Sequence, residues 1–131
     1  MIAKRTGAFY RKEILKFATG YEAVDNGVID ATTVSANADS RLVLEAGTVL
    51  CQVSASATAK LRPAANSGEV SGDIRGILVH NIEFFGNADS SYDEPCALFF
   101  WNAIFDTTQL VKYSGNAAAV KAALPSCSFR S

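Results

Sequence analysis

The sequence predicts a small, mainly β domain with short helices, a β-rich α+β fold. Three segments combine β-branched or aromatic residues with a glycine or proline at a bend, as short strands do. They are Arg41–Val53, Gly72–Ile82 and Pro95–Phe105. The chain has 131 residues, of which 49% are hydrophobic, so it can bury the core of one compact domain.

The first residues predict an arm in front of this domain. Residues 1–7 look like a flexible lead, and Gly20 is a plausible helix end. After this lead, the apolar residues Tyr10, Ile14, Phe17 and Tyr21 have the spacing of one face of a helix. Because so short a helix is marginal in water without packing, an extended arm that lays aromatic side chains on a neighbour is an alternative. We expect an arm over residues 1–27 and a β-rich domain with a helical tail over residues 28–131.

The first strands of the domain follow a turn. Asp25–Gly27 is a strong turn signal, because Asn and Gly tolerate a positive φ. We expect a strand in Val28–Val34 and another that begins at Leu42. Ala46-Gly47 should turn the chain into a further strand, Thr48–Val53.

The second half of the domain predicts a loop, two buried strands and two short helices. Residues 54–73 are mostly small and polar, with a short edge strand at Ala59–Arg62. Ile74–Ile82 is apolar enough to be a buried strand. Ala97–Phe105 is the most hydrophobic run, and its Trp101 should anchor the core or an interface. Two helices are expected after them: one with Asp106 as its N-cap, and one over Asn116–Leu124 that ends at Pro125.

Charge is unevenly distributed along the chain. The net charge is −1, which argues against a general nucleic-acid binder, since phosphate binding needs a cationic excess. Residues 1–17 hold five basic residues and one acidic residue, a net charge of +4; the other residues hold seven basic and twelve acidic residues, a net charge of −5. The basic start can reach an acidic partner surface or be a solvated end.

No residue pattern predicts catalysis, a metal site or a cofactor. Cys51, Cys96 and Cys127 lack the spacing of a zinc site or a disulfide framework. We expect Cys51 and Cys96 as apolar fillers and Cys127 as exposed. His80 is the only histidine, so a structural role is favoured, and the chain is not expected to be an enzyme. The sequence also lacks a secretory signal and the ~20 apolar residues of a membrane span.

Aromatic residues in adjacent positions predict self-association. Neighbouring side chains of a strand point to opposite faces, so aromatic pairs demand cover on both. Helices of the domain or another subunit could supply that cover, and for so small a domain we favour a subunit. The interface candidates are Phe84, Phe99 and Trp101.

Four phrases in this order resemble the lambda-type head decoration protein family of tailed bacteriophages. They are Glu13–Gly20, Gly47–Cys51, Ile74–Leu78 and Cys96–Phe105. The resemblance covers roughly residues 13–110 and rests on order and spacing, because each phrase alone is weak. The chain departs from the family at Cys51, where glycine is frequent, at the bulky Arg75 and Trp101, and in a longer tail after Leu110.

The resemblance implies a homotrimer that sits on the outer capsid surface of the virion. It would bind the major capsid protein and stabilise the shell against the pressure of packed DNA, after synthesis in the host cytoplasm. No cofactor, specific nucleic acid or membrane would take part. The arm over residues 2–20 would add backbone hydrogen bonds to a capsid strand. Capsid pockets would take the side chains of Phe9, Tyr10, Ile14, Leu15 and Phe17.

Two other classes share this composition. The first is another virion structural protein, such as a head-fibre base or a tail-tube element, which would polymerise into rings. The second is a small β-barrel binding module for oligonucleotides or a carried ligand, which would need a basic aromatic face. The acidic body of the chain argues against the second class.

Overall fold

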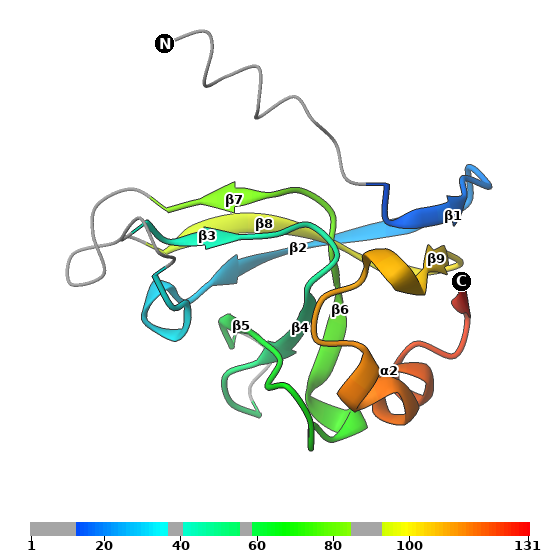
Figure 1. Cartoon of the computed structure of the whole chain (residues 1–131). Coiled ribbons are helices and arrows are strands. Elements are labelled where there is room, and N and C mark those ends of the chain that lie inside the picture. The colour runs from blue at the N-terminus through cyan, green and yellow to red at the C-terminus, as the bar shows by residue number, and fades with distance from the viewer. Residues whose placement is uncertain (1–12, 37–40, 56–58, 85–92) are drawn as a thin grey trace, which may run out of the picture.

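The protein is mainly β and is built around a closed five-stranded barrel (Figure 1). A computed structural model describes residues 13–36, 41–55, 59–84 and 93–131. The barrel strands follow in the order β2-β5-β4-β6-β8. Their bounds are Ala23–Ile29 for β2, Leu61–Pro63 for β5, Val49–Gln52 for β4, Ile74–Leu78 for β6 and Glu94–Trp101 for β8.

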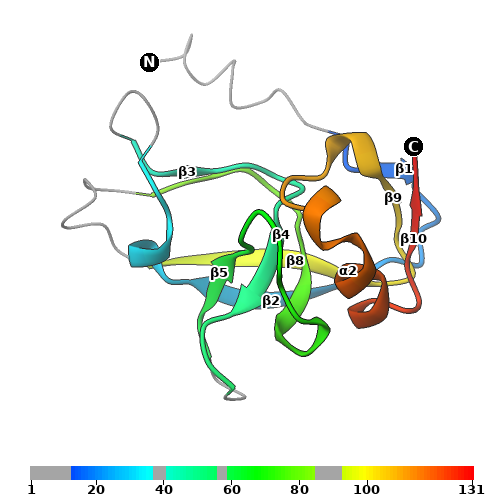
Figure 2. The same cartoon turned by 60° about the horizontal axis from the view of Figure 1, so that its bottom comes forward.

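Two smaller sheets flank the barrel. The first has the order β1-β9-β10, in which β1 is Leu15–Phe17, β9 is Ile104–Asp106 and β10 is Ser128–Arg130. In it β1 is antiparallel and β10 parallel to β9. The second pairs β3, Val43–Leu44, with β7, Ile82–Glu83. The amino-terminal strand and the carboxyl-terminal strand therefore meet on β9 (Figure 2).

Helical structure in the described residues is short. Four 3-10 turns occur at Ala31–Thr33, Ser71–Asp73, Thr107–Gln109 and Ser114–Asn116, and one α-helix, α2, spans Ala117–Ala123. The Asp106 carboxylate accepts the N–H of Thr108 at 3.0 Å, so its expected N-cap role is confirmed. The helix expected to end at Pro125 is α2, which packs against β6 (Figure 2).

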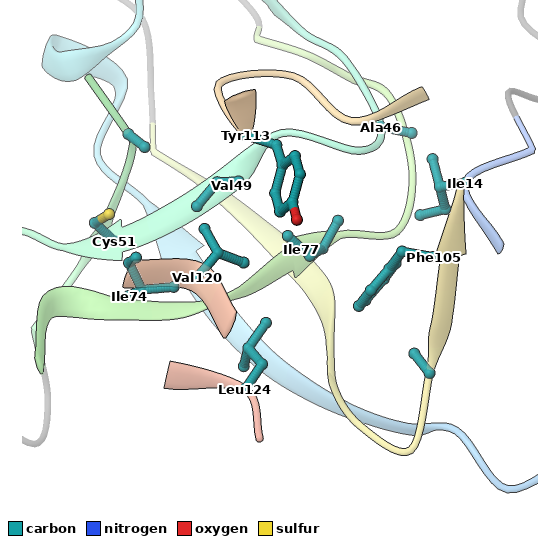
Figure 3. Packing of buried hydrophobic residues seen from close by; sticks show 12 residues of the cluster. Ile14, Ala46, Val49, Cys51, Ile74, Ile77, Phe105, Tyr113, Val120 and Leu124 are labelled. Carbon is teal, nitrogen blue, oxygen red and sulfur yellow. The ribbon is translucent and has the colours of Figure 1, made fainter. Parts of the chain in front are cut away.

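Two groups of buried side chains form the core. Figure 3 shows the first, where Phe105, Tyr113 and Ile77 point into the space between the barrel, α2 and β9. Phe129 stacks on both Phe105 and Tyr113, with ring centroids 5.2 Å apart in each pair. The second group takes a residue from each of the five barrel strands, Ile29, Leu61, Leu50, Leu78 and Leu98, together with neighbours such as Leu42 and Phe84.

Gly47 lies in the turn before β4, at the place where the sequence predicts a turn. Its φ is +90°, a left-handed conformation that disfavours residues with a Cβ. A Cβ there would lie 2.5 Å from the backbone oxygen of Gln109. The Gly47 N–H donates to Leu78 O at 2.8 Å, and its carbonyl accepts the Val111 N–H at 2.9 Å. The turn thus ties three distant segments together.

Three sequence-based expectations are wrong in the described residues. Asp25–Gly27 is no turn but the middle of β2, where pairing with β8 overrides the local turn preference. The helix expected from Tyr10 to Tyr21 is absent from its described part, because Leu15–Phe17 pairs with β9 as a strand. The segment after Ile29 forms a 3-10 turn capped by Asp30 rather than a longer strand. The boundary proposed after residue 27 consequently falls inside β2.

Candidate protein-interaction surface

The register of two strand pairs places two turns at one end of the molecule. Strand β1 pairs with β9, while β2, which follows β1, pairs with β8, which precedes β9. Phe17 lies opposite Ile104, and Ala23 lies opposite Trp101. The β1–β2 turn and the β8–β9 turn are therefore neighbours, whereas residue 13 enters the fold at the other end of β1, where the Asp106 N–H donates to Ile14 O (Figure 1).

Three exposed aromatic side chains stand on these turns. Phe17 is 55% exposed, Tyr21 78% and Trp101 50%. We call these three residues the aromatic corner. Val24, the second residue of β2, is 48% exposed and extends its apolar surface. Large aromatic side chains that remain exposed in a small domain are typical of protein-binding surfaces, since they bury much area with few rotatable bonds.

The β1–β2 turn is held by its own polar groups. Gly20 has a φ of +83°, and the Glu22 carboxylate accepts the N–H groups of Thr19 at 2.6 Å and Gly20 at 3.1 Å. The Thr19 hydroxyl donates to the same carboxylate. This hydroxyl bond, with the backbone N–H bonds, lowers the pKa of Glu22 below its ordinary value. Tyr21 is therefore presented on an ordered turn.

The β8–β9 turn is fixed from the carboxyl-terminal side. Asn102 has a φ of +56°, a left-handed conformation that asparagine tolerates. Its N–H donates to the Ser126 hydroxyl at 3.1 Å. The following Ala103 is fully buried, and its carbonyl accepts the N–H of Ser128 at 2.9 Å. These hydrogen bonds fix the turn that directly follows Trp101 at the end of β8.

Of the residues expected to contact the capsid, some are exposed in the structure and others are buried in the domain. Phe17 is exposed as the expected contact requires, whereas Ile14 is only 4% exposed and belongs to the domain's own core beside Phe105 (Figure 3). Leu15 is half-buried against the same core group. The expected arm therefore enters the domain at Ile14. Phe9 and Tyr10 lie outside the described residues.

The expected subunit-interface residues also differ in their exposure. Phe84 is 3% exposed and packs in the second core group, so its cover comes from its own chain. Phe99 is half-buried and meets Phe105 edge-on, with centroids 6.2 Å apart. Trp101 alone of the three is exposed. Tyr21 belongs to the predicted helix stripe but not to the expected contact residues, although its position directly after Gly20 is a usable signal for exposure.

The described cysteines and histidine form no reactive cluster. Within the residues that the structure places, no three His, Cys, Asp or Glu side chains gather as metal ligands would. His80 is exposed at a bend. Burial raises the pKa of Cys51 to about 12 and also raises the pKa of Cys96, so both thiols stay protonated, as expected for apolar fillers. Cys127 is half-buried rather than exposed, because it packs against the first core group.

A groove of about 330 Å³ is a second surface feature of the described residues. It lies between residues 33–35, β3, the end of β5 and residues 111–112. Its lining includes Glu45 and Lys112, and the Lys112 ammonium donates to Asn66 Oδ1 at 2.5 Å. None of the lining side chains is a histidine or cysteine. The groove therefore offers less for a functional assignment than the aromatic corner.

The fold and the exposed groups together define a small β-barrel protein with an exposed aromatic corner. No protein-family model and no curated protein sequence matches the chain. The described residues include no helix long and apolar enough to cross a membrane.

Proposed function

We propose that this protein is a capsid decoration protein, which binds the outer surface of a phage head as a trimer and strengthens the shell. The observation that carries the proposal is the aromatic corner, which only the short strand β1 separates in sequence from the basic amino-terminal segment. Phe17 and Trp101 stand exposed there, and the sequence before β1 contains Lys4, Arg5, Arg11 and Lys12. A hydrophobic anchor beside a cationic segment fits a partner surface that is acidic with apolar pockets.

The position of the four phrases that resemble the decoration family also supports the proposal. Gly47–Cys51 forms the turn into β4, Ile74–Leu78 is β6 and Cys96–Phe105 covers most of β8 and begins β9. Strands β4, β6 and β8 are neighbours in the barrel. Glu13–Gly20 contains β1, which adds to β9. The phrases therefore fall on one connected part of the fold.

The mechanism we propose is mechanical. A shell under internal pressure separates first where capsid subunits meet, and a trimer seated on such a junction ties several subunits together. Linked weak contacts release together only rarely, so modest affinity at each arm yields a stable attachment. Each arm, including Phe9 and Tyr10, would extend from the start of β1 and add a strand to the major capsid protein.

The test is binding to shells that lack decoration protein. Heads assembled from the major capsid protein of the same genome are incubated with the purified chain and pelleted. Wild-type protein should pellet with the heads and raise their resistance to heat. Phe17→Ala and Trp101→Ala should weaken binding at least about tenfold each, as loss of an aromatic anchor does.

A control variant tests whether the loss of any exposed apolar side chain weakens head binding. Val70→Ala removes an apolar side chain that is 59% exposed, in the loop before β6. This variant should bind heads like the wild type. Wild-type protein that stays in the supernatant at every concentration would remove the proposal. Ile14→Ala is unsuitable as a probe, because it opens a cavity in the core.

The closed barrel favours a second candidate, a small β-barrel binding module for oligonucleotides. Such modules bind single strands on aromatic platforms inside basic grooves. On the barrel surface here, β2 and β8 hold Asp25 and Glu94 and no Lys or Arg. A gel-shift titration with single-stranded oligonucleotides at low salt separates the candidates. Retardation that salt abolishes would favour the binding module.

A further inference from the structure

The groove between β3 and residues 111–112 lies close to the place where the chain enters the fold. Gly47 belongs to the turn that connects two lining residues, Glu45 and Thr48. A Cβ at Gly47 would lie 3.1 Å from Ile14 Cγ2, so Ile14 packs against this turn. Successive Cα atoms are about 3.8 Å apart, which places the Glu45 backbone within roughly 8 Å of Gly47. The chain before Ile14 therefore leaves the domain next to the groove.

The lining of the groove offers apolar contacts and a carboxylate. Its apolar members are Val34, Val43, Leu44, Pro63, Ala64 and Val111. Glu45 is the acidic member and is exposed, whereas the basic member, Lys112, already bonds Asn66. The volume of about 330 Å³ is small for a ligand pocket and suits the side chains of a short peptide. An occupant with an aromatic side chain beside a positive charge fits this lining.

The chain in front of Ile14 has this chemistry. Residues 1–12, which lie outside the described residues, contain no Asp or Glu and four basic residues: Lys4, Arg5, Arg11 and Lys12. Phe9 and Tyr10 come directly before the second basic pair. Tyr10 is four residues from Ile14, a reach of up to roughly 13 Å in an extended chain. Because a short tether keeps a segment at a high local concentration, even a weak contact with the groove is occupied.

We propose that residues 8–12 of the same chain occupy the groove while the protein is free of heads. The Tyr10 ring lies against the apolar lining, and the basic pair that follows it lies toward Glu45. A head that takes up the arm must displace this contact, so the groove and the capsid compete for the same segment. The competition rests on the proposed function, whereas the docking is a property of the free chain.

Nuclear magnetic resonance of the full, isotopically labelled chain tests the docking. Tyr10→Ser should shift the backbone amide signals of Val43 and Val111, which are far from it in sequence. In the unmodified chain, nuclear Overhauser contacts should join the Tyr10 ring to the methyl groups of the same valines. The matched control is Ile2→Ser, which removes an apolar side chain outside residues 8–12 and should leave the valine signals in place.

Glu45→Gln tests the charge contact. It should weaken docking about two- to fivefold, the effect of one exposed ion pair, and should move the amide signals of Arg11 and Lys12. Asp25→Asn is the matched control, because it removes a carboxylate from β2, outside the lining of the groove. This control should leave the signals of the arm unchanged.

Two results would overturn the inference. The first is a set of groove signals that does not respond to Tyr10→Ser. The second is contacts that form only between copies in a mixture of labelled and unlabelled chains, because the proposal places the segment in the groove of its own chain.

The outcome is separate from the test of head binding. A docked segment in a protein that never pellets with heads would keep the groove contact and refute decoration. A protein that pellets with heads but shows no groove contact would do the reverse. Where both hold, Glu45→Gln should bind heads more tightly by the factor by which it weakens docking, because less of the arm is held in the groove.

Discussion

The backbone N–H of Glu69 donates to the side-chain Oδ1 of Asn116 at 3.0 Å, across 47 residues of sequence. The Asn116 amide group donates in turn to Ala65 O at 2.8 Å and to Lys112 O at 2.9 Å. Asn116 is 4% exposed and directly precedes α2. One buried side chain therefore fastens the loop after β5 to the entry of the helix.

Asn116→Ala should destabilise the protein by about 1–3 kcal/mol, because it removes a buried side chain and the three hydrogen bonds that it makes to the backbone of Ala65, Glu69 and Lys112. Chemical denaturation followed by tryptophan fluorescence measures the loss. Asn66→Ala is the control, since the Asn66 side chain bonds the exposed Lys112 and its removal should cost roughly 0.5 kcal/mol or less. Equal losses in the two variants would contradict the role given to Asn116.

Gly47→Ala should cost about 1–3 kcal/mol, since an alanine there has a strained φ of +90° and meets the Gln109 backbone oxygen. Gly72→Ala is the matched control, because a Cβ at Gly72 meets no atom within 4 Å. Thermal unfolding of both variants gives the comparison. A Gly47→Ala variant whose melting temperature equals that of the wild type would contradict the prediction.

Acid should unfold the protein partly through Glu69. The Arg62 guanidinium bonds both Glu69 carboxylate oxygens, at 2.6 and 3.0 Å, and holds the pKa of Glu69 below its ordinary value of 4.5. A lowered pKa in the folded state gives stability that is present above about pH 4.5 and lost as the pH falls through the folded value. Glu69→Gln should flatten this acid limb of the stability profile.

The same profile measured in an Arg62→Met background checks the cause. Without the guanidinium, Glu69→Gln should change the acid limb far less than it does in the wild type. An identical effect in both backgrounds would show that Arg62 does not set the acid response of Glu69.

Thiol reagents should react slowly with the native protein. Burial raises the pKa of Cys51 to about 12 and raises the pKa of Cys127, so little reactive thiolate forms near neutral pH. Titration with a chromogenic disulfide should detect the three cysteines of the sequence rapidly only after denaturant is added. Rapid labelling of all three in the native state would contradict the described core.

The fold class could be predicted from the sequence because apolar runs survive as buried strands. Ile74–Leu78 and the apolar residues of β8 pack as their hydrophobicity requires. Local signals also identified the Gly47 turn and the Asp106 cap. The described fold is mainly β, as predicted.

Pairing between distant segments could not be predicted in this way. Asp25–Gly27 has a turn composition, yet seven residues of β2 align with β8. Ile14 lies on a helix-like stripe, yet its burial depends on β1 joining β9. The exposure of Trp101 likewise follows from the β8–β9 turn, because an apolar run alone predicts burial. Surface residues are fixed by tertiary register, which the local sequence does not contain.

Co-sedimentation with undecorated heads tests the central claim most directly. The account predicts saturable binding of wild-type protein, weakened by Phe17→Ala and Trp101→Ala and unchanged by Val70→Ala. Wild-type protein that never pellets with such heads, or binding that is indifferent to both aromatic substitutions, would contradict it.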